Sequence, residues 1–242
     1  MSCDHEFAAS DIGAPVSYHR TSGIGLFVSV DGPGGVGKST LVAELAAALR
    51  REAIPIHVTT EPTRTPLGNL LRHGTDTYHG LALACLVAGD RHHHLDSEIC
   101  PALARGHTVI SDRYLPSSLV LQRMDGLEWD LIRQLNTGLP TPDLAVIVNA
   151  QPHVIAARIA ARGAHSRFER QTDAGRTESR LYDDTARRLA ALGWPICAVD
   201  ATDQTPEQLT TTVCAHILAR ISGKAGSPFT PQASHGPWEE NR

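Results

Sequence analysis

Short apolar runs alternate along the chain with stretches in which apolar residues recur every three or four positions. The apolar runs predict buried strands over residues 24–31, 55–61, 107–112, 144–149 and 194–200. The stretches between them predict helices over residues 41–51, 78–105 with a break at Pro101, 127–135, 153–162, 178–192 and 206–221. Strands this apolar, separated by helices, are typical of a parallel sheet covered on both faces. The pattern therefore predicts an α/β fold, a three-layer sandwich around a five-stranded parallel sheet, with ligands at the carboxyl ends of the strands.

The two ends of the chain lack such patterns. Residues 1–22 show no sustained period, and residues 222–242 are rich in Gly, Ser and Pro. We expect a flexible N-terminal tail and a disordered C-terminal tail around one domain over residues 23–221.

Composition narrows the class of protein. A net charge of −4 gives no global basic field for nucleic acid or a membrane surface. The chain has no apolar run of the roughly 18 residues that a membrane helix needs, and its first residues lack the features of a signal peptide. Five scattered cysteines without a C-x-x-C pair favour a reducing compartment. We therefore expect a cytoplasmic protein with neither nucleic acid nor membrane as a partner.

The first apolar run leads directly into a glycine-rich loop and then a helix. The loop has the pattern G-x-x-x-x-G-K-S and comprises Gly32, Pro33, Gly34, Gly35, Val36, Gly37, Lys38, Ser39 and Thr40. Glycines let successive backbone N–H groups turn toward phosphate oxygens, and the helix N-terminus adds its positive end. This P-loop predicts ATP binding, with Lys38 on the β- and γ-phosphates and the Ser39 hydroxyl on Mg²⁺.

Two further groups of residues have the chemistry of phosphoryl transfer. Asp112 and Arg113 follow the third predicted strand, where a carboxylate can hold Mg²⁺ beside Ser39 and a guanidinium can fork onto an acceptor phosphate. Arg158 and Arg162 are four residues apart, so they share one helix face, and Arg167 and Arg170 follow Gly163. Mobile arginines beside a phosphate loop are typical of a closing lid, here over residues 163–173, that stabilises charge in the transition state.

Three adjacent histidines, residues 92–94, fall in a predicted helix. Consecutive helical residues point in three directions, whereas one metal ion needs ligands four residues apart on one face. We therefore interpret them as part of a solvated helix.

These groups, in this order, resemble the thymidylate kinase family over residues 24–220. Further matching segments are EPTRTPLG from Glu61, AGDR from Ala88, PAL from Pro101, VISDRY from Val109, and LP followed by PDL from Leu139. The resemblance implies transfer of the ATP γ-phosphoryl to a nucleoside 5′-monophosphate, with Mg²⁺ as cofactor and a homodimer as the usual assembly. The loop has Gly35 where one family type carries a catalytic arginine, so the chain resembles the type with that arginine in the lid, here Arg158 or Arg162.

The resemblance also implies which residues meet the acceptor nucleotide. Arg113 takes the family's role of clamping the acceptor phosphate, Arg91 contacts the base, and Ser118 touches the base edge. The full set expected at this end is Glu61, Arg64, Arg72, Val87, Arg91, Arg113, Ser117, Ser118, Leu121 and Gln122.

Three departures from the family pattern fall in the acceptor pocket. Gly34 replaces a loop carboxylate that binds the sugar 3′-hydroxyl, Val87 replaces a phenylalanine that stacks on thymine, and Leu121 replaces an aromatic residue near the sugar. Losing a stacking aromatic costs about 1–3 kcal/mol, so a wider base slot is expected. The default acceptor is dTMP. A different or modified nucleotide is the alternative, and a nucleotide-binding regulator without turnover is a third possibility.

Overall fold

The computed structural model describes residues 25–164, 166–170 and 174–225. Its centre is a sheet of five parallel strands in the order β2-β3-β1-β4-β5. The strands are β1 (Leu26–Asp31), β2 (Ile56–Thr60), β3 (Thr108–Asp112), β4 (Leu144–Asn149) and β5 (Ile196–Asp200). The predicted fold class is thus confirmed, and each strand lies within two residues of its expected bounds.

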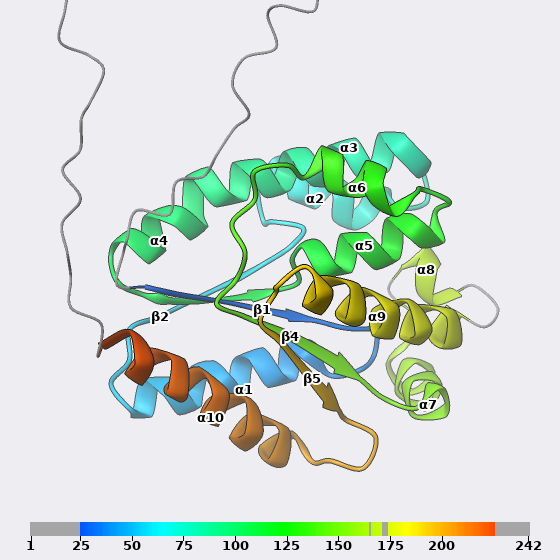
Figure 1. Ribbon diagram of the computed structural model, residues 1–242. Helices are drawn as coiled ribbons and strands as arrows, with labels where there is room; N and C mark the ends of the chain where they lie inside the picture. Colours follow the sequence, from blue (N-terminus) through cyan, green and yellow to red (C-terminus); the bar gives the residue numbers. More distant parts are fainter. Residues whose placement is uncertain (1–24, 165, 171–173, 226–242) are drawn as a thin grey trace, which may run out of the picture.

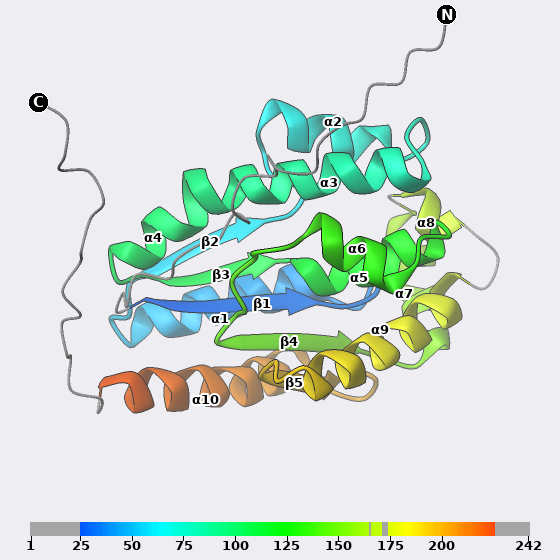
Figure 2. The same cartoon turned by 45° about the horizontal axis from the view of Figure 1, so that its top comes forward.

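Helices cover both faces of the sheet (Figure 1). The helices are α1 (Lys38–Arg51), α2 (Pro66–Gly74), α3 (Gly80–His94), α4 (Cys100–Ala104), α5 (Leu115–Met124), α6 (Trp129–Leu135), α7 (Pro152–Arg162), α8 (Arg167–Arg170), α9 (Ala174–Ala191) and α10 (Pro206–Ala225). Helices α1 and α10 lie together under one face, and α3, α5, α6 and α9 lie over the other (Figures 1 and 2). α10 continues past residue 221, where the C-terminal tail was expected to begin.

Alternating side chains of the strands build the two cores. Val28 packs with Leu45 of α1 and Val213 of α10, whereas its neighbour Phe27 packs with Leu119 of α5 on the other face. All five of these side chains are fully buried, as the strand period of two requires when both faces of the sheet are covered.

The expected helix break at Pro101 is wrong. A π-helical turn, η1 (Leu95–Ile99), follows α3, and α4 continues from Cys100 with Pro101 in its first turn. Proline is tolerated there because the first N–H groups of a helix have no intrahelical acceptor.

Two helices that the sequence pattern did not predict, α2 and α5, frame the site. The Thr65 side chain caps α2 by accepting a hydrogen bond from the Gly68 N–H at 3.2 Å, and Pro66 fills its first position. Asp31, at the end of β1, accepts hydrogen bonds from the N–H groups of Tyr114 (2.9 Å) and Ser117 (3.0 Å) at the start of α5. Such caps satisfy N–H groups that would otherwise lack acceptors.

None of the helices in the described ranges combines the length and hydropathy that crossing a bilayer requires.

Candidate active site

The phosphate loop, residues 32–40, leaves the carboxyl end of β1 and turns onto α1. Gly32 has φ +153° and approaches the Val148 carbonyl so closely that an added Cβ would lie 2.1 Å from its oxygen. Gly37 has φ 107° and caps α1. Both positions need a residue without a side chain. The buried Val36 side chain fixes the loop to the core below the sheet.

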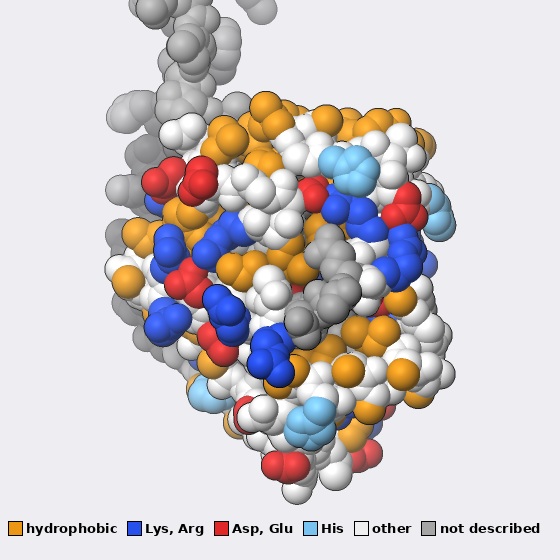
Figure 3. Space-filling view, turned by 90° about the vertical axis from the view of Figure 1, so that its right-hand side faces the viewer, with side chains coloured by type: hydrophobic (Ala, Val, Ile, Leu, Met, Phe, Trp, Pro, Cys, Tyr) orange, Lys and Arg blue, Asp and Glu red, His pale blue; other side chains and the backbone are white. Residues whose placement is uncertain are grey.

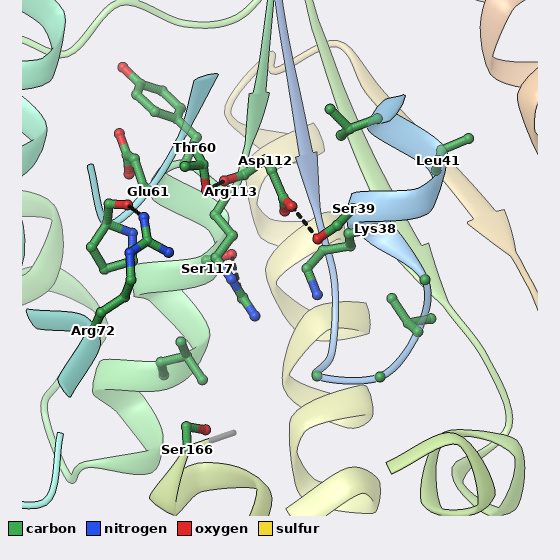
Figure 4. Close-up of a pocket in the computed structure, with 18 of the residues that line it drawn as sticks. Lys38, Ser39, Leu41, Thr60, Glu61, Arg72, Asp112, Arg113, Ser117 and Ser166 are labelled. Atoms are coloured by element: carbon green, nitrogen blue, oxygen red, sulfur yellow. Dashed lines mark hydrogen bonds between the residues drawn. The ribbon is translucent and has the colours of Figure 1, made fainter. Parts of the chain in front are cut away.

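Lys38 lies inside the loop and is almost fully buried. Its Nζ donates to the Pro33 carbonyl oxygen at 2.7 Å. Burial, and then the charge of Arg113, lower the pKa of Lys38 to about 7. Figure 4 shows the Lys38 and Arg113 side chains reaching into the same open space between the loop and the opposite wall. An anion placed there would meet both cations.

Ser39 and Asp112 meet at the ends of α1 and β3. The parallel register of β1 and β3 pairs Val30 with Asp112, which places this carboxylate beside the loop. The Ser39 hydroxyl donates to Asp112 Oδ2 at 2.6 Å (Figure 4). The other carboxylate oxygen, Oδ1, is buried and has no hydrogen-bond partner among the described residues. A hydroxyl beside a carboxylate with an unused oxygen is a donor set that fits Mg²⁺.

Arg113 marks the turn from β3 into α5. Its φ of 79° is left-handed, its N–H donates to the Val30 carbonyl at 2.9 Å, and its guanidinium donates to Ser117 Oγ at 3.3 Å. Ser117 is held in turn by Asp31, whose carboxylate accepts its hydroxyl at 2.7 Å. Asp31 is fully buried, and burial raises its pKa. This buried support of the arginine was not predicted.

The opposite end of the site is a buried polar network around Arg91. The guanidinium donates to Glu61 Oε2 at 2.8 Å, Asn136 Oδ1 at 2.6 Å and Ser118 Oγ at 2.7 Å. It also lies 5.6 Å over the ring of Tyr114. Arg91 is thereby fixed in the wall, with its donors directed at protein oxygens in this structure.

The three adjacent histidines differ in their surroundings. The interpretation as a solvated helix is wrong for His94, which is buried, with its ring 2.7 Å from Thr59 Oγ1 and 3.3 Å from Glu61 Oε1. His92 is half-buried and His93 is exposed. Across the ranges that the structure describes, no three His, Cys, Asp or Glu side chains form a group that could hold a metal ion.

An apolar wall lies between the two ends. Phe168 of α8 is buried in a cluster with Leu71 and Leu83, and Val87 and Leu121 pack against this cluster. The lid therefore supplies an aromatic ring next to the two positions where the family pattern has one. Val87, Leu121 and Phe168 all line the cavity, so the wider slot expected from Val87 and Leu121 stays a prediction, with the Phe168 ring as an apolar neighbour of both positions.

Helix α8 lies between the turns that follow α2 and α5 on one side and α7 on the other. Arg167 donates to Asp125 Oδ2 at 2.6 Å and also bonds the Thr75 carbonyl, and Arg170 bonds Asp76. On the other side, Glu169 pairs with Arg162 at 2.8 Å. α8 thus joins the turns after α2 and α5 to the end of α7. Figure 3 views this side of the molecule, where basic side chains gather among carboxylates.

The two arginines of α7 differ in their contacts. Arg158 donates to the Val36 carbonyl at 2.9 Å and the Ala201 carbonyl at 3.3 Å, so it braces the phosphate loop. Arg162 forms the ion pair with Glu169 and is about a third exposed. Both line the cavity, whereas Arg167 and Arg170 are directed away from it toward α2 and α5.

One cavity of about 1170 Å³ joins these parts. Its wall contains nearly all of the predicted site residues, namely Gly34, Gly35, Val36, Gly37, Lys38, Ser39, Thr40, Glu61, Arg64, Arg72, Val87, Arg91, Asp112, Arg113, Ser117, Ser118, Leu121, Gln122, Arg158 and Arg162. Of the predicted loop residues, Gly32 and Pro33 do not line the cavity. Among lining residues that were not predicted are Asp90, Phe168 and Glu169. The Asp90 carboxylate accepts hydrogen bonds from the Thr63 N–H at 2.8 Å and from the Thr63 hydroxyl at 2.6 Å. These two bonds fix the turn before α2.

A phosphate loop opening a parallel sheet, with an arginine and a second polar pocket across the same cavity, defines a P-loop kinase that acts on a small phosphorylated acceptor. The family model for thymidylate kinase matches residues 30–212, and the chain belongs to the thymidylate kinase family.

Individual relatives agree over most of the chain. A probable thymidylate kinase of Caldivirga maquilingensis is 33% identical over 204 residues, covering 83% of this chain and 95% of that protein. A thymidylate kinase of Xanthomonas euvesicatoria is 36% identical over 208 residues, covering 83% and 88%. A thymidylate kinase of Xanthomonas oryzae is 40% identical over 150 residues, covering 61% and 66%.

Proposed function

We propose that this chain transfers the γ-phosphoryl group of ATP to the 5′-phosphate of dTMP, giving dTDP and ADP. The observation that carries the proposal is the single cavity in which the phosphate loop faces a second, polar pocket with Arg113 between them. The named relatives, which match over most of the chain, make dTMP the acceptor.

The donor phosphates bind the loop. Residues 34–40 line the cavity, and the backbone N–H groups of a glycine-rich loop at the N-terminus of a helix such as α1 suit phosphate oxygens. Lys38 neutralises charge that shifts from the γ- to the β-phosphate oxygens during transfer. The bound phosphates compensate the cost of burying this ammonium.

Mg²⁺ would be held by the Ser39 hydroxyl and, directly or through water, by Asp112. The partnerless Oδ1 of Asp112 supports this assignment. Bound there, the ion would screen charge between donor and acceptor phosphates.

Arg113 positions the acceptor phosphate. Its guanidinium reaches the space beside Lys38 and is held from behind by Ser117. A forked contact would leave one phosphate oxygen of dTMP free for in-line attack on the γ-phosphorus. Arg72 and Arg64, exposed on the same wall, would add positive charge around that phosphate.

The base of dTMP is placed at the Arg91 end. Ser118 and Gln122 of α5 offer polar groups there, and Phe168 with Val87 and Leu121 offers an apolar surface for the pyrimidine ring. Arg91 acts at this end chiefly by fixing Glu61 and Ser118, whose oxygens it bonds.

The catalytic arginine is assigned to the lid. Gly35 leaves the loop without one. Of the two arginines that α7 places on the cavity, Arg158 donates to two backbone carbonyls, whereas Arg162 pairs with Glu169, a contact that a phosphate could replace. When ATP is bound, Arg162 would exchange Glu169 for a γ-phosphate oxygen.

We also propose a cytoplasmic homodimer. Leu70, Leu81 and Leu131 are exposed apolar side chains on α2, α3 and α6, a surface suited to a second copy. Cys85, Cys197 and Cys214 are free thiols, which suits a reducing compartment. The molar mass in solution tests the dimer.

The test of the reaction is ADP release with dTMP and a panel of other nucleoside monophosphates. The proposal is supported if ADP release requires an acceptor and the kcat/KM for dTMP is at least tenfold higher than that for each of the other monophosphates. Preference for another nucleotide would assign the chain to a different acceptor, and ATP binding without turnover would make it a regulator.

A further inference from the structure

The amide of Gly34 is held by a carboxylate that no motif of the sequence indicates. Glu178 lies on α9, 144 positions further along the chain, and both of its carboxylate oxygens accept from the Gly34 N–H at 3.2 Å. Its side chain is 3% exposed and does not line the cavity, so it supports the loop from behind.

The surroundings of Glu178 are those of the reacting centre. Lys38 and Arg113 attract its charge, and Glu169 of α8 and Asp31 of β1 lie in the same group of charges. Tyr182, one turn further along α9, is fully buried with its hydroxyl 3.0 Å from Ser117 Oγ. α9 therefore contacts both the phosphate loop and the support of Arg113 through buried polar groups.

The loop has a reason to need such a support. Gly34 carries no side chain of its own to fix it, and an ideal Cβ there would lie 2.2 Å from Glu169 Oε1. A glycine is the residue whose backbone is ordered at the greatest entropic cost. The Gly34 N–H is therefore one of the few groups through which the rest of the fold can fix this part of the loop.

We propose that Glu178 is a positioning residue for ATP: from α9 it holds the Gly34 amide, and with it the phosphate loop, in the conformation that receives the donor phosphates. The inference rests on the proposed function for the identity of the nucleotide. The carboxylate itself stays behind the loop and takes no part in the transfer.

The test compares two variants that both remove the charge. Glu178→Gln keeps an oxygen at the same reach to accept from Gly34, whereas Glu178→Leu fills similar space without an acceptor. The matched control is Glu44→Gln, the same exchange at an exposed position of α1. ATP and dTMP affinities are measured separately by calorimetry, and kcat and KM follow by ADP release.

Because the two variants carry the same charge, their difference isolates the hydrogen bond. We expect Glu178→Leu to bind ATP about tenfold more weakly than Glu178→Gln, the effect of one buried hydrogen bond. Both should bind dTMP within about twofold of the parent, since the contact lies on the donor side, and the loss should appear in KM for ATP more than in kcat.

Other outcomes overturn the inference. Equal ATP affinity of the Gln and Leu variants would show that the Gly34 contact does not position the loop. A parallel loss of dTMP affinity would show a general structural role. ATP affinity is measured without turnover, so a parent that binds ATP but phosphorylates no nucleotide refutes the proposed reaction and leaves this comparison intact.

Discussion

The positive charge of Lys38 is unfavourable in the free protein, because the side chain is almost completely buried and a second cation, the Arg113 guanidinium, lies nearby. Desolvation and then Arg113 depress its pKa to about 7, against the partial compensation of Asp112, Glu178 and Asp31. In the free protein this lysine therefore loses its proton as the pH rises through about 7. Donor phosphates at the loop would raise the pKa of Lys38 and restore this proton, because a nearby negative charge favours the protonated form.

The consequence is proton uptake when ATP binds. At pH 8 Lys38 is mostly neutral in the free protein, and ATP phosphates, with pKa near about 6, are already ionised. Binding should therefore draw most of one proton from the buffer at pH 8, and this uptake should disappear as the pH falls to 6, where Lys38 is already charged and the partly protonated phosphate releases protons instead. Calorimetry in two buffers of different ionisation enthalpy measures this number directly. No uptake at pH 8 would show that Lys38 is protonated in the free protein.

Arg113 should serve the acceptor rather than the donor. Arg113→Ala removes a charge-assisted fork, so KM for dTMP should rise roughly 10- to 100-fold. ATP affinity should stay within about twofold, since Lys38 and the loop remain. The control is Arg105→Ala, an exposed arginine at the other end of β3. Collapse of ATP affinity with intact dTMP affinity would show that the clamp is assigned to the wrong substrate.

At the scale of elements, the sequence predicted the strands and the phosphate loop, whose signals lie in consecutive residues. Five apolar runs predicted five strands, and the glycines and lysine of residues 32–40 predicted the loop, because a phosphate cradle needs those residue types in a fixed order. α5 was missed because its first N–H groups are capped by Asp31, a residue more than 80 positions earlier. For α2, Thr65 and Pro66 were local signals of a helix start that could have been used.

The same distinction separates the predicted site residues from the missed ones. Lys38, Asp112 and Arg113 lie in or beside motifs, whereas Glu178 and Phe168 meet the site only because α8 and α9 fold back over it. Glu178 lies in an arginine-rich helix whose pattern resembles a solvated face. Nothing in its neighbours along the chain shows that its carboxylate reaches Gly34.

The two arginines of α7, just before the proposed lid, should have separable effects. Arg162→Ala should lower kcat by at least about tenfold with ATP affinity nearly unchanged, because a contact made mainly in the transition state appears in kcat. Arg158→Ala should weaken ATP binding instead, since Arg158 holds the Val36 carbonyl of the loop. Full kcat in Arg162→Ala would remove the lid-arginine assignment. Steady-state kinetics with both substrates varied distinguishes the two effects.

Phe168 should couple the lid to the acceptor. Phe168→Ala opens the apolar cluster with Leu71 and Leu83, and losing a buried aromatic side chain costs about 3–5 kcal/mol. Part of that loss should appear as a higher KM for dTMP, by about tenfold, and as faster proteolysis of the lid. Phe168→Leu keeps an apolar side chain and should retain most of the dTMP affinity. Unchanged dTMP kinetics in Phe168→Ala would show that the ring only fills the closed lid.

At the scale of the whole molecule, the arrangement follows from parallel strands. β1 and β3 end at the same edge of the sheet, so the loop after β1 and Arg113 after β3 face one cavity although they are far apart in sequence. Helices α2, α3 and α5 complete the acceptor end, and α7 to α9 close the side between them. The proposed donor and acceptor sites are therefore two ends of one cavity.

That continuity predicts how a joined ligand binds. In a compound that links adenosine and thymidine through a chain of phosphates, each half raises the effective concentration of the other. The linked compound should bind at least about tenfold more tightly than ATP or dTMP alone. The analogue with adenosine at both ends should show a much smaller gain in affinity, because its second adenine would have to enter the pocket beside Ser118 and Phe168 that we assign to thymine. Calorimetry on the three ligands measures the difference. Equal affinities for the linked compound and ATP would show that the phosphate loop and the polar pocket at Arg91 do not bind their ligands at the same time. The proposed reaction, which needs both ligands in one cavity, would then lose its structural support.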